Sequence, residues 1–135
     1  MTRIVMDSNV AISAIVFGGK PRQVLDSALR GNTQLCISEA LVAELRRVLL
    51  RPKFCLTAEM VETIISELVL MAVWAEPQQS VDVVKDDPDD NMLLECALAS
   101  YSDCIVTGDS HLLNLGDWKG IKILTADRYI EDYLS

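Results

Sequence analysis

The amino-acid sequence predicts an α/β fold of three layers, α/β/α, with a central parallel sheet that helices flank on both faces. Short apolar or β-branched runs alternate with segments of helical periodicity along the chain, which is typical of parallel sheets with helical crossovers. The length of 135 residues indicates a single domain over residues 1–135, and the hydrophobic content of 50% predicts a substantial buried core.

In the amino-terminal half, a β-branched run that ends at Asp7 predicts a buried strand. Ser38 is a favourable N-cap and Pro52 breaks helices, so these residues bracket a helix that ends at about Leu50. The expected strands in this half are residues 3–6 and 34–37, and the expected helices are residues 10–17, 21–29, 38–50 and 57–71.

In the carboxy-terminal half, Asp87 and Pro88 predict the start of a long helix. Asp accepts a backbone N–H at the N-cap, and Pro fits the first helical position. Thr125 is expected to cap the last helix in the same way. The expected strands are residues 73–75, 104–107 and 121–124, the expected helices are residues 88–100, 110–115 and 125–133, and the expected loops are residues 77–80 and 116–120.

The net charge of −8 is a poor match to a simple nucleic-acid binder, which usually carries a basic surface. It does not exclude a metal-dependent nuclease, because bound divalent cations offset clustered carboxylates. The start of the chain lacks a signal-peptide pattern, and the longest apolar-rich run, residues 60–74, is too short and too charged to span a bilayer. We therefore expect no membrane association.

The cysteines predict reduced, unpaired thiols. Cys36, Cys55, Cys96 and Cys104 are far apart, each in an apolar segment, and no CxxC pair occurs. Because His111 is the only histidine, we expect no zinc site. Buried free thiols indicate a reducing compartment, so we expect a cytoplasmic protein.

A cluster of aspartates surrounds the start of the helix at residue 88. Asp86, Asp87, Asp89 and Asp90 fall within five positions, and such carboxylates repel one another unless a cation or water lies among them. A capped, solvated helix start explains the first three. It explains Asp90 less well, because Asp90 lies three and four residues before leucines of the buried stripe and so faces the core.

Two other acids share the expected placement of Asp90. Asp7 ends the first strand and Asp109 follows the strand at residues 104–107, and ligand sites in parallel sheets lie beyond the carboxyl ends of the strands. Glu44 lies on the apolar face of its helix and can reach the same edge. Oxygen ligands suit Mg²⁺ or Mn²⁺, and two such ions about 3.5–4 Å apart can activate water and stabilise the leaving oxygen in phosphodiester cleavage.

Each of these acids also has a structural explanation. Asp7 and Asp109 can cap the helices that follow them, and Glu44 can pair with a buried arginine at some cost. Independent structural roles give the acids no reason to converge, so convergence favours a metal site.

A basic group follows Glu44 on the same helix and in the turn after it. These side chains can contact a phosphate backbone, such as that of RNA, or can complement the helix dipole at a solvated end, and sequence alone favours the dipole. The members of the group are Arg46, Arg47, Arg51 and Lys53.

Four motifs, in matching order and spacing, resemble those of the PIN domain family. They are VMDSN at residues 5–9, ELRRVLLRPKF at residues 44–54, DPDDNMLLECALA at residues 87–99 and VTGDSHLL at residues 106–113. The similarity extends from residue 3 to about residue 129. In particular, the chain resembles the prokaryotic single-domain PIN proteins that are toxin components of toxin–antitoxin pairs (VapC-like).

The resemblance implies a PIN-like, Rossmann-like fold and a Mg²⁺- or Mn²⁺-dependent endoribonuclease that cleaves single-stranded or structured RNA. The catalytic and metal-binding acids of the family map onto Asp7, Glu44, Asp90 and Asp109. The family also implies a homodimer or higher homo-oligomer and a cognate antitoxin protein as partner.

Supporting positions follow from the same resemblance. Asn9 matches a small polar position near the first acid, with Ser8 beside it, and Ser110 matches the polar position beside the last acid. Asp87 matches a recurrent DP step, which we assign to capping rather than to metal binding. Asn91 departs from the family pattern, in which a further acid is common, so the helix start is slightly less negative and the resemblance does not firmly imply a second, weak metal site.

Two other functions stay open at this point. A phosphotransfer or phosphatase-type α/β protein also places an Asp after the first strand, but the haloacid-dehalogenase-like pattern needs a second Asp where this chain has Asn9. A receiver needs paired acids and a late lysine, and neither is evident. A non-catalytic PIN-like binding module would use the acids only as helix caps and as a surface for a basic partner.

Overall fold

A six-stranded sheet forms the middle layer of the protein, whose computed structural model describes residues 1–84 and 87–134. The strand order is β3-β2-β1-β4-β6-β5, and β5 alone among these strands runs antiparallel to its neighbour. The predicted three-layer α/β fold is therefore confirmed. The strands are β1 (Thr2–Met6), β2 (Thr33–Ser38), β3 (Val73–Ala75), β4 (Cys104–Val106), β5 (Asp117–Trp118) and β6 (Ile121–Leu124).

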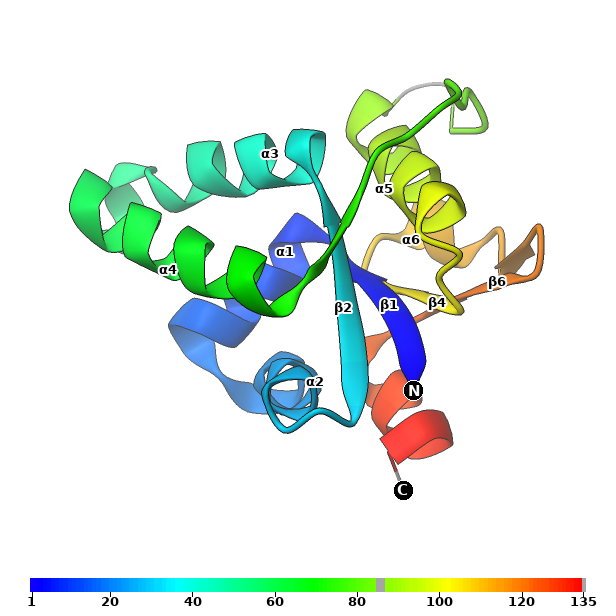
Figure 1. Ribbon diagram of the computed structural model, residues 1–135, viewed down its shortest axis with the longest axis horizontal. Coiled ribbons are helices and arrows are strands. Elements are labelled where there is room, and N and C mark those ends of the chain that lie inside the picture. The colour runs from blue at the N-terminus through cyan, green and yellow to red at the C-terminus, as the bar shows by residue number, and fades with distance from the viewer. Residues whose placement is uncertain (85–86, 135) are drawn as a thin grey trace.

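Helices cover both faces of the sheet (Figure 1). Helices α1 to α4 lie on one side and α5 and α6 on the other, as right-handed crossovers require. No helix among the described residues has the length and apolar character needed to cross a membrane. The helices are α1 (Ser8–Ile12), α2 (Gly19–Leu29), α3 (Glu39–Leu49), α4 (Ala58–Met71), α5 (Pro88–Ala99), α6 (Ser110–Leu113) and α7 (Ala126–Tyr129), and the shorter helical turns are η1 (Ser13–Phe17), η2 (Pro52–Phe54) and η3 (Ile130–Leu134).

The chain reverses its direction across the sheet at β1. From β1 it passes to β2 and β3 on one side and then returns to β4, which pairs with the other side of β1. Ligand sites of open α/β sheets lie at such a switch point, beyond the carboxyl ends of the strands. The backbone N–H of Asp7 donates a hydrogen bond to the carbonyl of Val106 at 2.9 Å, so the two strand ends are joined there.

The two central strands form a buried base for this edge. Ile4 and Val5 of β1 and Ile105 and Val106 of β4 have no exposed surface. Burial of each such side chain stabilises the fold by about 1.5–3 kcal/mol. A parallel sheet covered on both faces requires such continuous apolar runs. Because the two strands are held firmly in the core, the residues that directly follow them, Asp7 and Thr107, have well-defined positions.

The prediction of a loop at residues 116–120 is wrong in part, because the segment contains the edge strand β5. Lys119 and Gly120 both have positive φ, 52° and 81°, and two such residues make the tight turn that a two-residue hairpin prefers. Lysine gives no turn signal, whereas Asn or Asp in its place would have marked the hairpin. The predicted helix at residues 10–17 begins earlier, at Ser8, and becomes a π-helical turn at Ser13.

Three of the cysteines are buried as expected, but Cys55 is exposed. It ends the turn η2 with φ of 54°, in the left-handed region, on the surface connection between α3 and α4. The neighbouring residues Phe54 and Leu56 pack against the core in its place. The apolar character of this segment therefore reflects the packing of Phe54 and Leu56 against the core and not burial of the Cys55 thiol.

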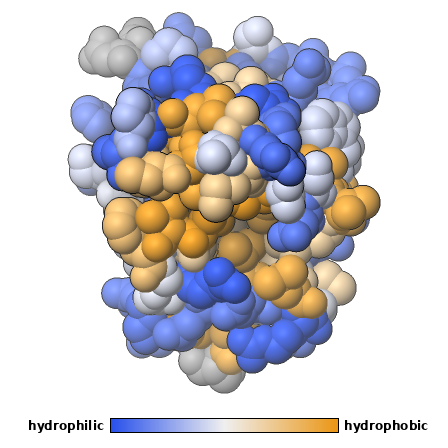
Figure 2. Space-filling model, turned by 90° about the vertical axis from the view of Figure 1, so that its left-hand side faces the viewer, coloured by the Kyte–Doolittle hydropathy of each residue, from blue (hydrophilic) through white to orange (hydrophobic). Residues whose placement is uncertain are grey.

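One side of the molecule carries an apolar face. Figure 2 shows apolar side chains gathered on the side where α1, α2 and α4 lie. Phe17 is 75% exposed and Leu29 is 60% exposed. A hollow of about 170 Å³ between α2 and α4 is lined by Leu29, Ile64 and Met71 among others. Contiguous apolar surface of this kind is typical of sites of protein association.

Candidate metal centre

Asp7 lies at the end of β1 and is almost fully buried. Its Oδ1 accepts a hydrogen bond from the backbone N–H of Asn9 at 3.2 Å, which caps α1, and its Oδ2 accepts one from the hydroxyl of Thr107 at 2.7 Å. Burial raises the pKa of Asp7, and these two hydrogen bonds lower it by a smaller amount. The carboxylate of Asp7 therefore caps a helix with one oxygen and is held in place through the other by Thr107, the residue after β4.

Thr107 joins two of the acids, a role that the sequence analysis missed. It follows β4, is fully buried, donates to Asp7, and accepts the backbone N–H of Asp109 at 3.0 Å. Asp109 in turn caps α6, because its Oδ1 accepts the backbone N–H of His111 at 2.7 Å. A threonine directly after a buried apolar strand was the available signal, since a buried hydroxyl needs partners.

The first turn of α5 brings two more aspartates to the same edge. Asp87 caps the helix by accepting the backbone N–H of Asp89 on Oδ1 at 3.1 Å. One carboxylate oxygen from each of Asp87, Asp90 and Asp109 lies within 4.8 Å of the others. Asp90 is 4% exposed, and its Oδ2 has no hydrogen-bond partner among the described residues. Asp86, the remaining aspartate of this stretch, lies outside the described residues.

The electrostatic environment raises the pKa of Asp90 to about 7. Burial is the largest cause, and the nearby carboxylates of Asp109, Asp87 and Asp7 add to it. A carboxylate in such a place binds a proton or a cation more readily than one in water.

Glu44 approaches the cluster from α3 and is half-buried. The hydroxyl of Ser8 donates a hydrogen bond to its Oε2 at 3.0 Å, so its partner is a serine and not the buried arginine considered above. Burial raises the pKa of Glu44, and the charges of Asp89 and Asp7 raise it further. Asp89, which the sequence analysis assigned to solvent, therefore interacts with Glu44.

No basic side chain offsets this cluster within the described part of the chain. The ion pairs there join Arg22 to Asp26, Arg46 to Glu62 and Arg128 to Asp132. A divalent cation would offset the repulsion among the carboxylates and would satisfy the unpartnered oxygen of Asp90. The donor set consists of hard oxygen atoms, so the residues fit a hard divalent cation.

Asn91 proves to be a clamp on the segment that precedes α5. Its side-chain oxygen accepts the backbone N–H groups of Val83 and Val84, both at 3.0 Å, and its side-chain nitrogen donates to the carbonyls of Val84 at 2.7 Å and Asp87 at 3.4 Å. Asn91 is almost fully buried, and an acid could not make the two donated bonds. The departure from the family pattern therefore has a structural role that the sequence analysis did not foresee.

The other supporting residues contribute in simpler ways. Asn9 acts through its backbone N–H, because its side chain is exposed. Ser110 begins α6 and its side chain is likewise exposed.

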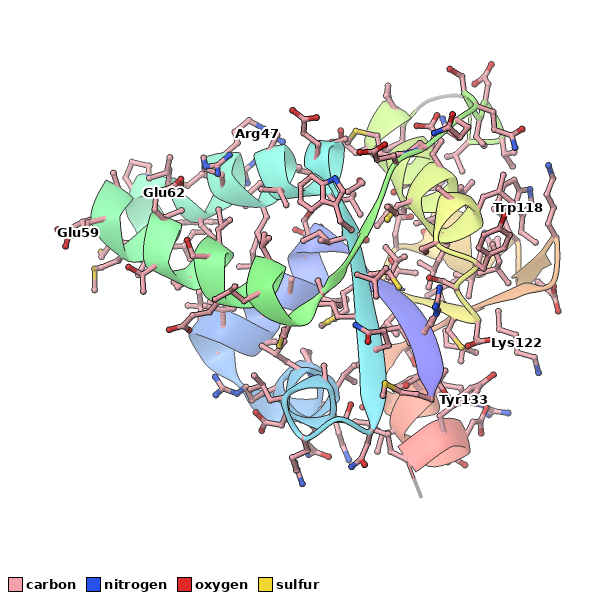
Figure 3. The ribbon with its side chains drawn as sticks, in the orientation of Figure 1. Arg47, Glu59, Glu62, Trp118, Lys122 and Tyr133 are labelled. Atoms are coloured by element: carbon pink, nitrogen blue, oxygen red, sulfur yellow. The ribbon has the colours of Figure 1, made fainter. Side chains whose placement is uncertain are left out.

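The basic group divides into a paired and an unpaired part. Arg46 forms an ion pair with Glu62 of α4 at 2.9 Å and so links α3 to α4. Figure 3 shows Arg47 on α3 and Glu62 on α4, both toward the end of the molecule away from α5. Arg47, Arg51 and Lys53 are exposed, and they take part in no ion pair among the described residues.

A protein-family model described as the PIN domain matches residues 3–111 of the chain. The matched segment extends from β1 into α6 and includes Asp7, Glu44, Asp87, Asp90 and Asp109. No curated protein gives a significant match to the chain. The match confirms the family resemblance of the motifs and does not separate the toxin subgroup from the rest of the family.

We expect Asp90→Asn to stabilise the cation-free protein at pH 8 by about 1–3 kcal/mol. Because the pKa of Asp90 is raised to about 7 from an ordinary 3.8, the folded state binds this proton more tightly than the unfolded state. Its contribution to stability is therefore lost as the pH rises from about 4 to about 7. Urea unfolding in EDTA at pH 5 and pH 8 measures the effect, with Glu59→Gln as a surface control. If the difference in the free energy of unfolding between wild type and Asp90→Asn does not change with pH, the raised pKa of Asp90 is contradicted.

Asn91→Asp should lower the free energy of unfolding by about 2 kcal/mol, because two donated hydrogen bonds are lost at a buried position. Asn32→Asp makes the same chemical change at an exposed position and serves as the control. Thermal unfolding followed by circular dichroism compares the two variants. Equal melting temperatures for both variants would show that the clamp has no importance for stability.

Proposed function

The chain belongs to the PIN domain family, and we propose that it is a metal-dependent endoribonuclease that cleaves single-stranded or structured RNA. PIN domains are generally nucleases, so cleavage of a phosphodiester bond is the reaction class. The observation that carries the proposal is the meeting of carboxylates from Asp87, Asp90 and Asp109 at the sheet's switch point, together with a buried oxygen of Asp90 that has no donor among the described residues. Helix capping alone does not account for that oxygen.

In this proposal Asp7, Glu44, Asp90 and Asp109 hold Mg²⁺ or Mn²⁺. Such an ion, when bound, lowers the pKa of water and offsets the negative charge that develops on the phosphodiester. The chain itself orients three of the ligands: Thr107 donates to Asp7, Ser8 donates to Glu44, and capping of α6 fixes Asp109. Asp90 is held by its buried position in the first turn of α5. Ligands that are held in this way lose little freedom when the ion binds.

RNA binding is assigned to the unpaired basic residues at the end of α3 and in η2. Arg47, Arg51 and Lys53 are exposed and available to phosphate groups. Arg46 has a structural part, because its ion pair with Glu62 holds α3 against α4. Because Glu44 and Arg47 lie on the same helix, α3, an RNA backbone bound to the basic residues would run along α3 toward the acids.

We assign the protein to the cytoplasm as the toxin of a toxin–antitoxin pair, with a cognate antitoxin and a second copy of the chain as partners. The motif resemblance carries this part of the proposal. The apolar face around Phe17 and Leu29 supports association with protein, since surfaces of this kind are often covered by a partner.

Asp7→Asn is expected to reduce RNA cleavage more than about 100-fold, since even outer-shell changes at metal sites cost about 10–100-fold. Asparagine also caps helices, so the variant should keep its fold. Cleavage of a labelled RNA strand in Mg²⁺ or Mn²⁺ measures the effect, and a DNA strand of the same sequence tests the preference for RNA. Asp26→Asn, which alters a surface ion pair, is the control. Equal rates for wild type and Asp7→Asn would falsify the mechanism.

Induced expression of the wild-type chain in a bacterial host should slow growth, because a free ribonuclease toxin degrades cellular RNA. Asp7→Asn at the same protein level should leave growth unchanged. Growth curves with immunoblotting compare the two. If both variants slow growth equally, or if neither does, the toxin assignment fails while the nuclease assignment stands on the cleavage assay.

A further inference from the structure

We infer that Asp87 is a direct ligand of the cation as well as the N-cap of α5, an inference that rests on the proposed metal-dependent activity. From the sequence we assigned this residue to capping alone. The structure places its carboxylate in the tightest group of acids that the described residues contain, together with Asp90 and Asp109.

The spacing of this group suits a single ion. One oxygen from each of the three aspartates lies within 4.8 Å of the others. Oxygen ligands lie about 2.0–2.1 Å from Mg²⁺, so two ligands on opposite sides of the ion are about 4.2 Å apart. At most one pair among three ligands can lie on opposite sides of one ion, so the three oxygens would draw closer together when they share a cation.

The orphaned oxygen of Asp90 is the second observation that points to a ligand. Asp90 is 4% exposed, and its Oδ2 accepts no hydrogen bond from the described residues. A buried carboxylate oxygen without a partner is unfavourable, because no hydrogen bond offsets its loss of contact with water. A cation bound by the group would remove this cost, whereas capping by Asp87 leaves it unchanged.

The two oxygens of Asp87 can serve two purposes at once. Oδ1 accepts the backbone N–H of Asp89 at 3.1 Å, and Oδ2 takes part in no hydrogen bond among the described residues. The clamp residue Asn91 donates to the backbone carbonyl of Asp87, which fixes the position of this residue in front of the helix. One oxygen is therefore committed to the fold while the other is free for the ion.

Asp89 provides a matched control for the contribution of charge alone. It lies in the same first turn of α5 and carries the same charge, but it interacts with Glu44 and does not belong to the group of three. If Asp87 acted only through its charge, removal of either carboxylate would weaken cation binding to a similar extent.

Calorimetric titration of the full chain with Mn²⁺ at pH 8, without RNA, tests the inference. Asp87→Asn should weaken Mn²⁺ binding by at least about 10–100-fold, the loss that even outer-shell changes cause. Asp89→Asn should weaken it by less than about threefold, since an exposed charge contributes little. Asn and Ser both cap helices as Asp does, so Asp87→Asn and Asp87→Ser should keep the circular dichroism spectrum of the wild type.

The outcomes separate this inference from the proposed function. If wild type binds Mn²⁺ and the Asp87 and Asp89 variants bind it equally well, Asp87 is not a ligand and the metal-dependent function is unaffected. If wild type itself binds no Mn²⁺, both proposals fall. Loss of binding in both folded Asp87 variants, with binding retained in Asp89→Asn, supports Asp87 as a ligand.

Discussion

The fold brings several carboxylates close together at one edge of the sheet, and their mutual repulsion is the constraint that the surrounding structure has to offset. The sheet reverses its strand order at β1, and this reversal brings the residues after β1 and β4 side by side. Helices α3 and α5 then bring further acids to the same edge. Without a cation the chain offsets this repulsion in part, through backbone N–H groups at helix starts and through the hydroxyls of Ser8 and Thr107.

Capping and ion binding use the same side chains in this protein. A carboxylate has two oxygens, and Asp87 and Asp109 each give one of them to the first turn of a helix. One oxygen of each also lies within 4.8 Å of an oxygen of Asp90, which is buried and whose Oδ2 has no donor among the described residues. A structural role for an acid therefore does not argue against a chemical one, and here the structural role sets the direction in which the carboxylate points.

The parts of the fold that follow local rules were predictable from the sequence. Apolar β-branched runs marked the parallel strands, and Ser38, Asp87 and Thr125 cap helices as expected. The β5 hairpin was missed because Lys119 adopts positive φ without a turn signal. The sequence could indicate that the hydroxyl of Thr107 needs partners, but not which ones, because tertiary placement brings it to Asp7, 100 residues away, and to the backbone N–H of Asp109. The interaction of Asp89 with Glu44 of another helix depends on tertiary placement in the same way.

The surface position of Cys55 has a practical consequence. The other three thiols are buried, so a thiol-specific reagent reaches a single site on the folded native chain. That site lies beside Lys53 and Phe54, at the end of the basic segment. A spin label or fluorophore can therefore be attached there without engineering a new cysteine, and its signal would report from the surface on which we expect RNA to bind.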